Sequence, residues 1–222
     1  MPEKLDIYYD HYKETNELNK AAHVRRNKNF IVLCILEAIS FLMIVNPDFM
    51  CALINETARK HLEYPIKVSN SILQSLIWVL IMYVLMRYVQ DTLYVERQYG
   101  YLDLLEKKIA VLLKEGKDDN IFSREGANYL KDYPMVLNLI DLFYKMFAPI
   151  FFTFINVVRI KQEWNCGIEK IFLICDTVIF VGIIVITWFY FFEIHDRITA
   201  WFMKCKCFAK IAQALRSLLK EV

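Results

Sequence analysis

Four long apolar runs, separated by blocks of charged residues, are the feature that most constrains the fold of this chain. A helix needs about 20 mostly apolar residues to cross a hydrocarbon core of roughly 30 Å, because lipid offers no hydrogen-bond partner to a free backbone group. The chain has 222 residues, of which 57% are hydrophobic. This pattern predicts an all-α membrane protein. Its four transmembrane helices are expected over residues 30–47, 72–88, 135–158 and 171–192.

The distribution of Lys and Arg predicts the orientation of these helices. Six lie before the first span, eight between the second and third spans, and six after the fourth. The two short loops on the other side hold three each, and Arg159 is assigned to the second of them. Because cytoplasmic loops carry an excess of Lys and Arg, we expect both termini in the cytoplasm. The membrane would be the plasma membrane (the inner membrane of a bacterium), or an endomembrane in a eukaryote.

The predicted spans divide the chain into five parts. The N-terminal segment is expected to form a helix at the membrane interface, and the C-terminal tail to form a basic amphipathic helix. In chain order, the parts are a cytoplasmic segment (1–28), a transmembrane hairpin (29–90), a cytoplasmic helical insert (91–134), a second transmembrane hairpin (135–196) and a cytoplasmic amphipathic tail (197–222).

The second span has no clear stop signal and is expected to continue as one long helix to near Gly116. Its cytoplasmic part carries apolar residues mostly three and four apart, which is typical of a coiled coil or an amphipathic helix. Such a stripe can pack on its own chain, or it can contact another subunit or a partner protein. The residues of this stripe are Val95, Leu102, Leu105, Ile109 and Leu112.

Ionisable residues inside the spans are the main candidates for function, because a charge in the membrane is costly. They are Glu37, Asp141, Lys145 and Asp176. Asp141 and Lys145 are four residues apart and can pair, or Lys145 can extend to the membrane surface. We expect Glu37 and Asp176 to face a shared polar interior, where lining a pore, forming an interhelical hydrogen bond or carrying a proton on the carboxyl would each satisfy them. Pro149 is expected to kink the third span.

Several classes of function are disfavoured by what the sequence lacks. The four His are scattered, and there is no Gly-rich phosphate loop or nucleophile elbow, so we expect no enzymatic activity and no cofactor. The six Cys show no metal-ligand arrangement, so no metal is expected. Cys51 and Cys166 both fall in predicted outer loops and can form a disulfide if that side is oxidising. The net charge of +2 does not suggest direct binding to nucleic acid.

Two segments of the predicted insert, YGYLDLLEKKI (99–109) and FSREGANYLKDYP (122–134), complete a layout that resembles small four-span bacterial membrane proteins. Some of these accompany phage-defence loci, including the four-span accessory proteins of type VI-B CRISPR systems. The resemblance is one of layout and covers most of the chain. It implies a regulator or effector that acts at the inner membrane by forming or opening a pore.

These observations favour a non-enzymatic, homo-oligomeric membrane protein that conducts ions or perturbs the lipid bilayer. Two alternatives remain open. In one, the spans anchor a scaffold whose cytoplasmic helices recruit a soluble partner. In the other, the protein carries a small molecule, although the two halves show no internal repeat of the kind that carriers often have.

Overall fold

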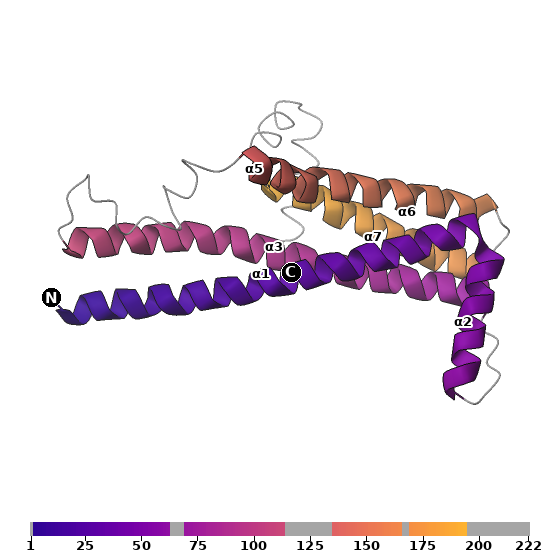
Figure 1. The fold of residues 1–222 in the computed structure, drawn as a ribbon. Helices are drawn as coiled ribbons and strands as arrows, with labels where there is room; N and C mark the ends of the chain where they lie inside the picture. Colours follow the sequence, from indigo (N-terminus) through magenta and orange to yellow (C-terminus); the bar gives the residue numbers. More distant parts are fainter. Residues whose placement is uncertain (1, 63–68, 114–134, 166–168, 195–222) are drawn as a thin grey trace, which may run out of the picture.

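A computed structural model describes residues 2–62, 69–113, 135–165 and 169–194, and its elements are all helices (Figure 1). The predicted all-α class is therefore confirmed for this part of the chain. The elements are α1 (Pro2–Val45), α2 (Pro47–Leu62), α3 (Asn70–Leu113), α5 (Met135–Leu142), the π-helix η1 (Phe143–Phe147), α6 (Ala148–Asn165) and α7 (Lys170–Ile194).

Three of these helices, α1, α3 and α7, are long and apolar enough to cross a membrane. Helix α1 contains residues 30–45 of the first predicted span (30–47), α3 contains the whole second span, and α7 matches the fourth closely. The long helix expected from the second span is also present, because α3 runs without a break to Leu113. These findings agree with a membrane protein that has several spans.

The third predicted span, 135–158, is built from α5, η1 and α6 in succession. The backbone N–H of Ala148 bonds to the carbonyl of Phe143, five residues earlier, which defines the π turn. Pro149 follows directly and has no backbone N–H to donate to the preceding turn. The regular α-helical pattern of backbone hydrogen bonds is therefore interrupted here. The helix then continues to Asn165, seven residues beyond the predicted end.

Residues 2–28 of α1 and 91–113 of α3 extend together past the other helices, and we call this part the stalk (Figure 1). The sequence predicted an interfacial helix at the N-terminus, whereas the structure continues it into the first apolar run. No Gly or Pro between Glu3 and Val45 interrupts the helix. Across the stalk, the Tyr12 hydroxyl donates to Glu106 at 3.1 Å.

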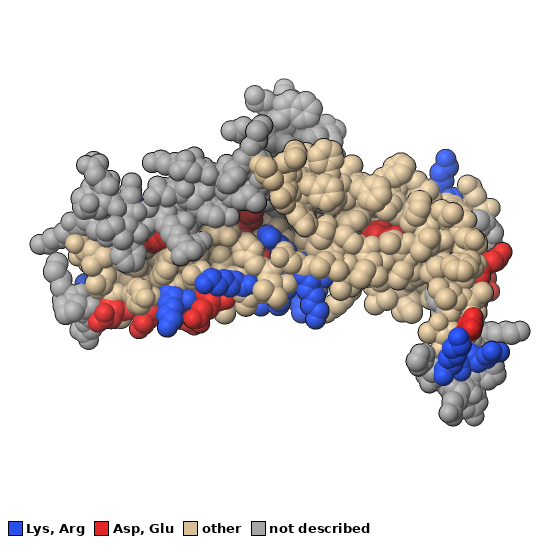
Figure 2. All heavy atoms as spheres, viewed as in Figure 1, with Lys and Arg blue, Asp and Glu red and all other residues tan. Residues whose placement is uncertain are grey.

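The remaining parts of α1 and α3 pack with α6 and α7 into a four-helix bundle (Figure 1). Its core includes Leu33 from α1, Trp78 and Ile81 from α3, and Ile183 from α7, all at most 2% exposed. On the face shown in Figure 2, charged side chains gather along the stalk and on α2, while the surface over the bundle is mostly uncharged. This is the distribution expected if lipid surrounds the bundle.

At the end of the bundle opposite the stalk, α2 projects sideways from the other helices (Figure 1). This segment was expected to be part of a short outer loop, but the structure shows a helix of 16 residues. Asn46 caps it, because its side-chain oxygen accepts a hydrogen bond from the backbone of Phe49 at 3.2 Å. Pro47 stands at the first helical position, where its missing N–H costs nothing.

Candidate functional site: a polar cluster inside the bundle

Arg159 lies in the middle of α6 and is only 2% exposed, so its assignment to an outer loop was wrong. Its guanidinium is held by three acceptors. Nε donates to Glu163 at 3.0 Å, Nη1 donates to Ser40 on α1 at 2.9 Å, and Nη2 donates to the backbone carbonyl of Gln74 on α3. These bonds supply partners within the protein for a charge that lipid could not stabilise.

Trp78 of α3 completes the surroundings of the Arg159–Glu163 ion pair. Its indole N–H donates to both carboxylate oxygens of Glu163, at 2.9 and 3.1 Å. The guanidinium carbon of Arg159 lies 4.3 Å from the centre of a Trp78 ring, a distance at which a cation is attracted to an aromatic face. The ion pair is therefore buried, hydrogen-bonded and covered by an aromatic side chain.

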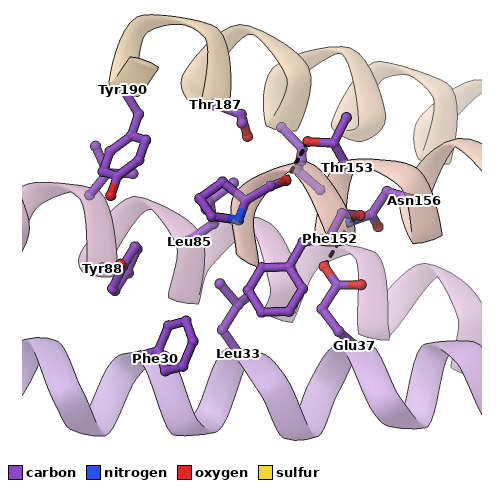
Figure 3. A pocket seen from close by; sticks show the side chains of 13 residues that line it. Phe30, Leu33, Glu37, Leu85, Tyr88, Phe152, Thr153, Asn156, Thr187 and Tyr190 are labelled. Carbon is purple, nitrogen blue, oxygen red and sulfur yellow. Dashed lines mark hydrogen bonds between the residues drawn. The ribbon is translucent and has the colours of Figure 1, made fainter. Parts of the chain in front are cut away.

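Glu37 of α1 lies within the same interior and is 2% exposed. The side-chain N–H of Asn156, on α6, donates to Glu37 Oε1 at 2.7 Å (Figure 3). Glu37 Oε2 and Asn156 Oδ1 are buried and have no hydrogen-bond partner among the described residues. The carboxyl thus has one interhelical hydrogen bond and one oxygen that the protein leaves unsatisfied.

Asp176 of α7 is buried in a similar way, at 1% exposure. Ser75 of α3 donates its hydroxyl to Asp176 Oδ2 at 3.0 Å, whereas Oδ1 has no partner in the described part of the chain. The structure therefore places both Glu37 and Asp176 inside the bundle, each in an interhelical hydrogen bond. Whether they line a pore stays a prediction.

Carboxyl groups outnumber cationic groups in this cluster. Glu37, Glu163 and Asp176 surround the single guanidinium of Arg159, which pairs directly with Glu163 alone. The carboxyls of Glu37 and Asp176 therefore lack an ion-pair partner among the described residues. A carboxylate in this position is expensive to bury, and a bound proton or cation removes that cost. The arrangement is suited to taking up a positively charged species.

The sequence contains a signal for this cluster that the predicted span boundaries obscure. Asn156, Arg159 and Glu163 are three and four residues apart, so they lie on one face of α6. The predicted third span ended at residue 158. This boundary assigned Asn156 to the membrane and Arg159 and Glu163 to the following loop, so their common face was not recognised. The signal that could have revealed the site was the helical spacing of polar residues across that boundary.

Three spaces border the cluster, and one of them is an open, almost wholly apolar groove of about 880 Å³ between α1 and the η1–α6 segment that has Glu37 in its lining. The linings of the other two include several polar side chains. At the end of the bundle near α2 is an open pocket of about 320 Å³, which we call the vestibule. Arg159 and Glu163 both border it, so the ion pair is reached from that end. The vestibule is lined by Ser40, Met43, Ile44, Pro47, Asn70, Ser71, Gln74, Arg159, Gln162, Glu163 and Glu169.

The third space, the inner cavity, lies on the stalk side of Glu37 and has a volume of about 20 Å³ (Figure 3). Side chains from α1, α3, α6 and α7 converge on it. Its polar lining comes from Glu37, Tyr88, Thr153, Asn156, Thr187 and Tyr190, and its apolar lining from Phe30, Leu33, Leu85, Val89, Pro149, Phe152 and Ile183.

The other predicted site residues lie outside this cluster or outside the described part of the molecule. Asp141 is in α5 and Lys145 is in η1, but their side chains are not among those the structure describes. The proposed disulfide also falls outside, because it involves Cys166 and the side chain of Cys51. Among the described residues, no group of His, Cys, Asp or Glu could hold a metal ion.

The apolar stripe of the stalk is buried within the chain itself. Val95, Leu102, Leu105 and Ile109 are at most 2% exposed, and Leu112 is partly buried. Nearby, His23 of α1 shares a hydrogen bond of 2.9 Å with the Tyr99 hydroxyl of α3. This placement corresponds to the alternative in which the stripe packs on its own chain. A contact with a second subunit stays a prediction.

Comparison of the chain with protein-family models, curated proteins and solved structures finds no match. The geometry of the cluster is therefore the basis for inferring a function.

Proposed function

We propose that this protein is a non-enzymatic, multi-pass membrane protein that conducts ions through the interior of its helix bundle. The observation that carries the proposal is the pair of buried carboxyls, Glu37 and Asp176, that have no ion-pair partner in the described residues. They lie in a cluster that opens to the vestibule at one end and meets the inner cavity at the other. Buried ionisable groups in membrane proteins commonly mark ion pathways.

In this proposal α5, η1 and α6 together form the third span of the chain, in addition to the spans in α1, α3 and α7. They contain 8, 5 and 18 residues, which at about 1.5 Å per residue exceed a hydrocarbon core of roughly 30 Å. The polar face of α6 turns toward α1 and α3, as the bonds from Arg159 to Ser40 and Gln74 demonstrate. The exposed residues of α6 include Phe151 and Phe154, which suit a lipid environment.

The proposed orientation places the stalk and both termini in the cytoplasm and the vestibule on the outer side of the plasma membrane. The excess of Lys and Arg in the N-terminal segment, the insert and the tail supports this orientation. The polar path lies within one chain, so conduction by this route does not require an oligomer. Homo-oligomerisation and a role as an effector or regulator in antiviral defence extend the proposal, the latter on the resemblance in layout alone.

One observation favours a second candidate, a membrane-anchored scaffold. The stalk extends well past the bundle (Figure 1), and its surface carries exposed large side chains such as Tyr101 and Val111. A soluble partner could bind this surface. A scaffold makes no use of the buried carboxyls, and this separates the two candidates.

Ion flux from liposomes that contain the purified protein tests the proposal. The wild type should release a trapped ion faster than empty liposomes, and E37Q/D176N should slow that release at least tenfold. Both substitutions keep the shape of the side chain and remove its charge. The matched control is E14Q/E17Q, which neutralises two exposed carboxylates of the stalk and should leave flux unchanged. A wild type as impermeable as empty liposomes would favour the scaffold.

A further inference from the structure

We propose that the ion conducted is the proton, and that Glu37 is the group that takes it up and releases it toward the stalk. This inference rests on the proposed function and specifies the ion. It is carried by the size of the inner cavity, by the unsatisfied oxygens beside it and by the aromatic layer that closes it.

The inner cavity is too small for a hydrated metal ion. Its volume of about 20 Å³ holds about one water molecule. Its polar lining consists of one carboxyl, one amide and four hydroxyl side chains, spread over four helices. Selective sites for metal cations instead surround the ion with a ring of oxygen ligands that replaces its water shell. A single water molecule is sufficient to carry a proton.

Three oxygen atoms in the lining of this cavity have no hydrogen-bond partner among the described residues: Glu37 Oε2, Asn156 Oδ1 and the Tyr190 hydroxyl. Asn156 Nδ2 is already bonded to Glu37 Oε1. A proton on Glu37 Oε2 turns that oxygen from an acceptor into a donor. A water molecule in the cavity likewise brings two donor hydrogens. A proton on Glu37 and one bound water molecule would together supply the donor hydrogens that these oxygens lack.

An aromatic layer closes the stalk side of the cavity. Phe30 packs against Tyr88 and Phe152, with ring centres 5.7 and 6.1 Å apart, and Tyr88 packs against Tyr190 at 6.1 Å (Figure 3). Phe30, Tyr88 and Tyr190 therefore stand between the cavity and the stalk (Figure 3). Tyrosine hydroxyls both donate and accept hydrogen bonds, so a proton can be handed across the layer without opening it.

Polar groups stand on both sides of this closed region. On the vestibule side, Ser40 lies one helical turn from Glu37 and borders the vestibule. On the stalk side, Asp91 lies three residues beyond Tyr88 and accepts a hydrogen bond of 2.9 Å from Asn29, the neighbour of Phe30. A proton leaving the tyrosines therefore has a carboxylate close to the far side of the layer.

The charged and titratable groups around Glu37 come from every helix of the bundle. Arg159 of α6 is the cation that acts on it, and its charge is offset by Glu163. Asp176 of α7 also interacts with Arg159. Cys34 of α1 interacts electrostatically with Glu37. Tyr88 of α3 and Tyr190 of α7 border the same cavity.

The proposed transfer is balanced in atoms and charge. A proton from the vestibule binds the carboxylate of Glu37 at Oε2 and gives the neutral acid. The acid then transfers that proton to the cavity water, which passes one of its own through the tyrosine hydroxyls toward Asp91. The carboxylate of Glu37 is regenerated, so each cycle moves one proton and changes no bond other than O–H bonds.

The experiment compares proton flux with Na⁺ and K⁺ flux in liposomes that hold the purified full-length chain and a trapped pH indicator. The wild type should acidify the interior under an applied potential while Na⁺ and K⁺ stay within the background of empty liposomes. E37Q should reduce proton flux at least tenfold, and the exposed-residue control E17Q should leave it unchanged. Y190F, which removes one hydroxyl and keeps the ring, should reduce proton flux several-fold and serves as the test if E37Q fails to fold.

Four outcomes decide between the claims. Proton flux that depends on Glu37, without metal-ion flux, supports the inference. Na⁺ or K⁺ flux that E37Q reduces overturns the proton assignment and leaves the proposed function intact. Absence of flux for every ion overturns the proposed function as well. Proton flux that neither E37Q nor Y190F changes also overturns the inference.

Discussion

Arg159 illustrates at the residue scale how a charge is retained inside an apolar bundle. Two of its three hydrogen bonds connect α6 to α1 and α3, the third pairs it with Glu163, and the Trp78 ring lies against the guanidinium. Removing one member of a buried ion pair leaves the other charge unpaired, which costs far more than the net stabilisation that the intact pair provides. The cluster should therefore be sensitive to single substitutions and tolerant of paired ones.

We predict that R159M lowers the free energy of unfolding by about 3–5 kcal/mol, because Glu163 is left buried without its cation. The control is K161M, at an exposed position two residues along the same helix. It should change the free energy of unfolding by less than about 0.5 kcal/mol. Denaturant titration in detergent micelles measures both. R159M/E163Q should recover most of the loss, since the amide oxygen can still accept from Trp78. Equal stability of R159M and the wild type would contradict the role assigned to the ion pair.

At the element scale, the stalk shows two long helices held together by a narrow apolar seam. Leu105 is 2% exposed, whereas its neighbour Leu104 is 45% exposed, so adjacent leucines differ sharply in environment. The helices are continuous with those of the bundle. Motion of the stalk would therefore be transmitted directly to the segments of α1 and α3 that carry Phe30 and Tyr88.

We predict that L105A destabilises the stalk by about 2–5 kcal/mol, because it leaves a cavity in the seam between α1 and α3. L104A makes the same chemical change on the exposed side and should have an effect below about 0.5 kcal/mol. Hydrogen exchange of the backbone amides in residues 95–113 reports local opening of this seam. Similar exchange rates in the two variants would mean that the buried seam does not hold the stalk together.

The sequence predicted the helices better than it predicted the polar cluster inside the bundle. Apolar runs located α1, α3 and α7 because an uninterrupted hydrophobic helix has a strong signature. The helix that holds the third predicted span continues to Asn165, seven residues past the predicted end. A rule that stops at charge cannot foresee that Ser40 and the Gln74 carbonyl satisfy Arg159. Glu37 and Asp176 were found by their position within spans, but their partners Asn156 and Ser75 depend on helix packing that composition does not encode.

At the scale of the whole molecule, the polar groups of the bundle are arranged along its axis. The vestibule lies at the end near α2, the buried cluster follows, and the inner cavity and aromatic layer lead toward the stalk. On the face shown in Figure 2, the surface over the bundle is mostly uncharged, while charge gathers on the stalk and on α2. An ion that enters at the vestibule would meet every polar element of the interior in turn.

The most direct test of this account is to block the vestibule from outside while flux is measured. In a chain whose six natural cysteines are replaced by alanine, S71C places a thiol in the vestibule lining, and R59C places one on the exposed surface of α2. A membrane-impermeant cationic thiol reagent should reduce flux through S71C at least fivefold and leave flux through R59C unchanged. Undiminished flux through fully labelled S71C would contradict an ion pathway that enters at the vestibule.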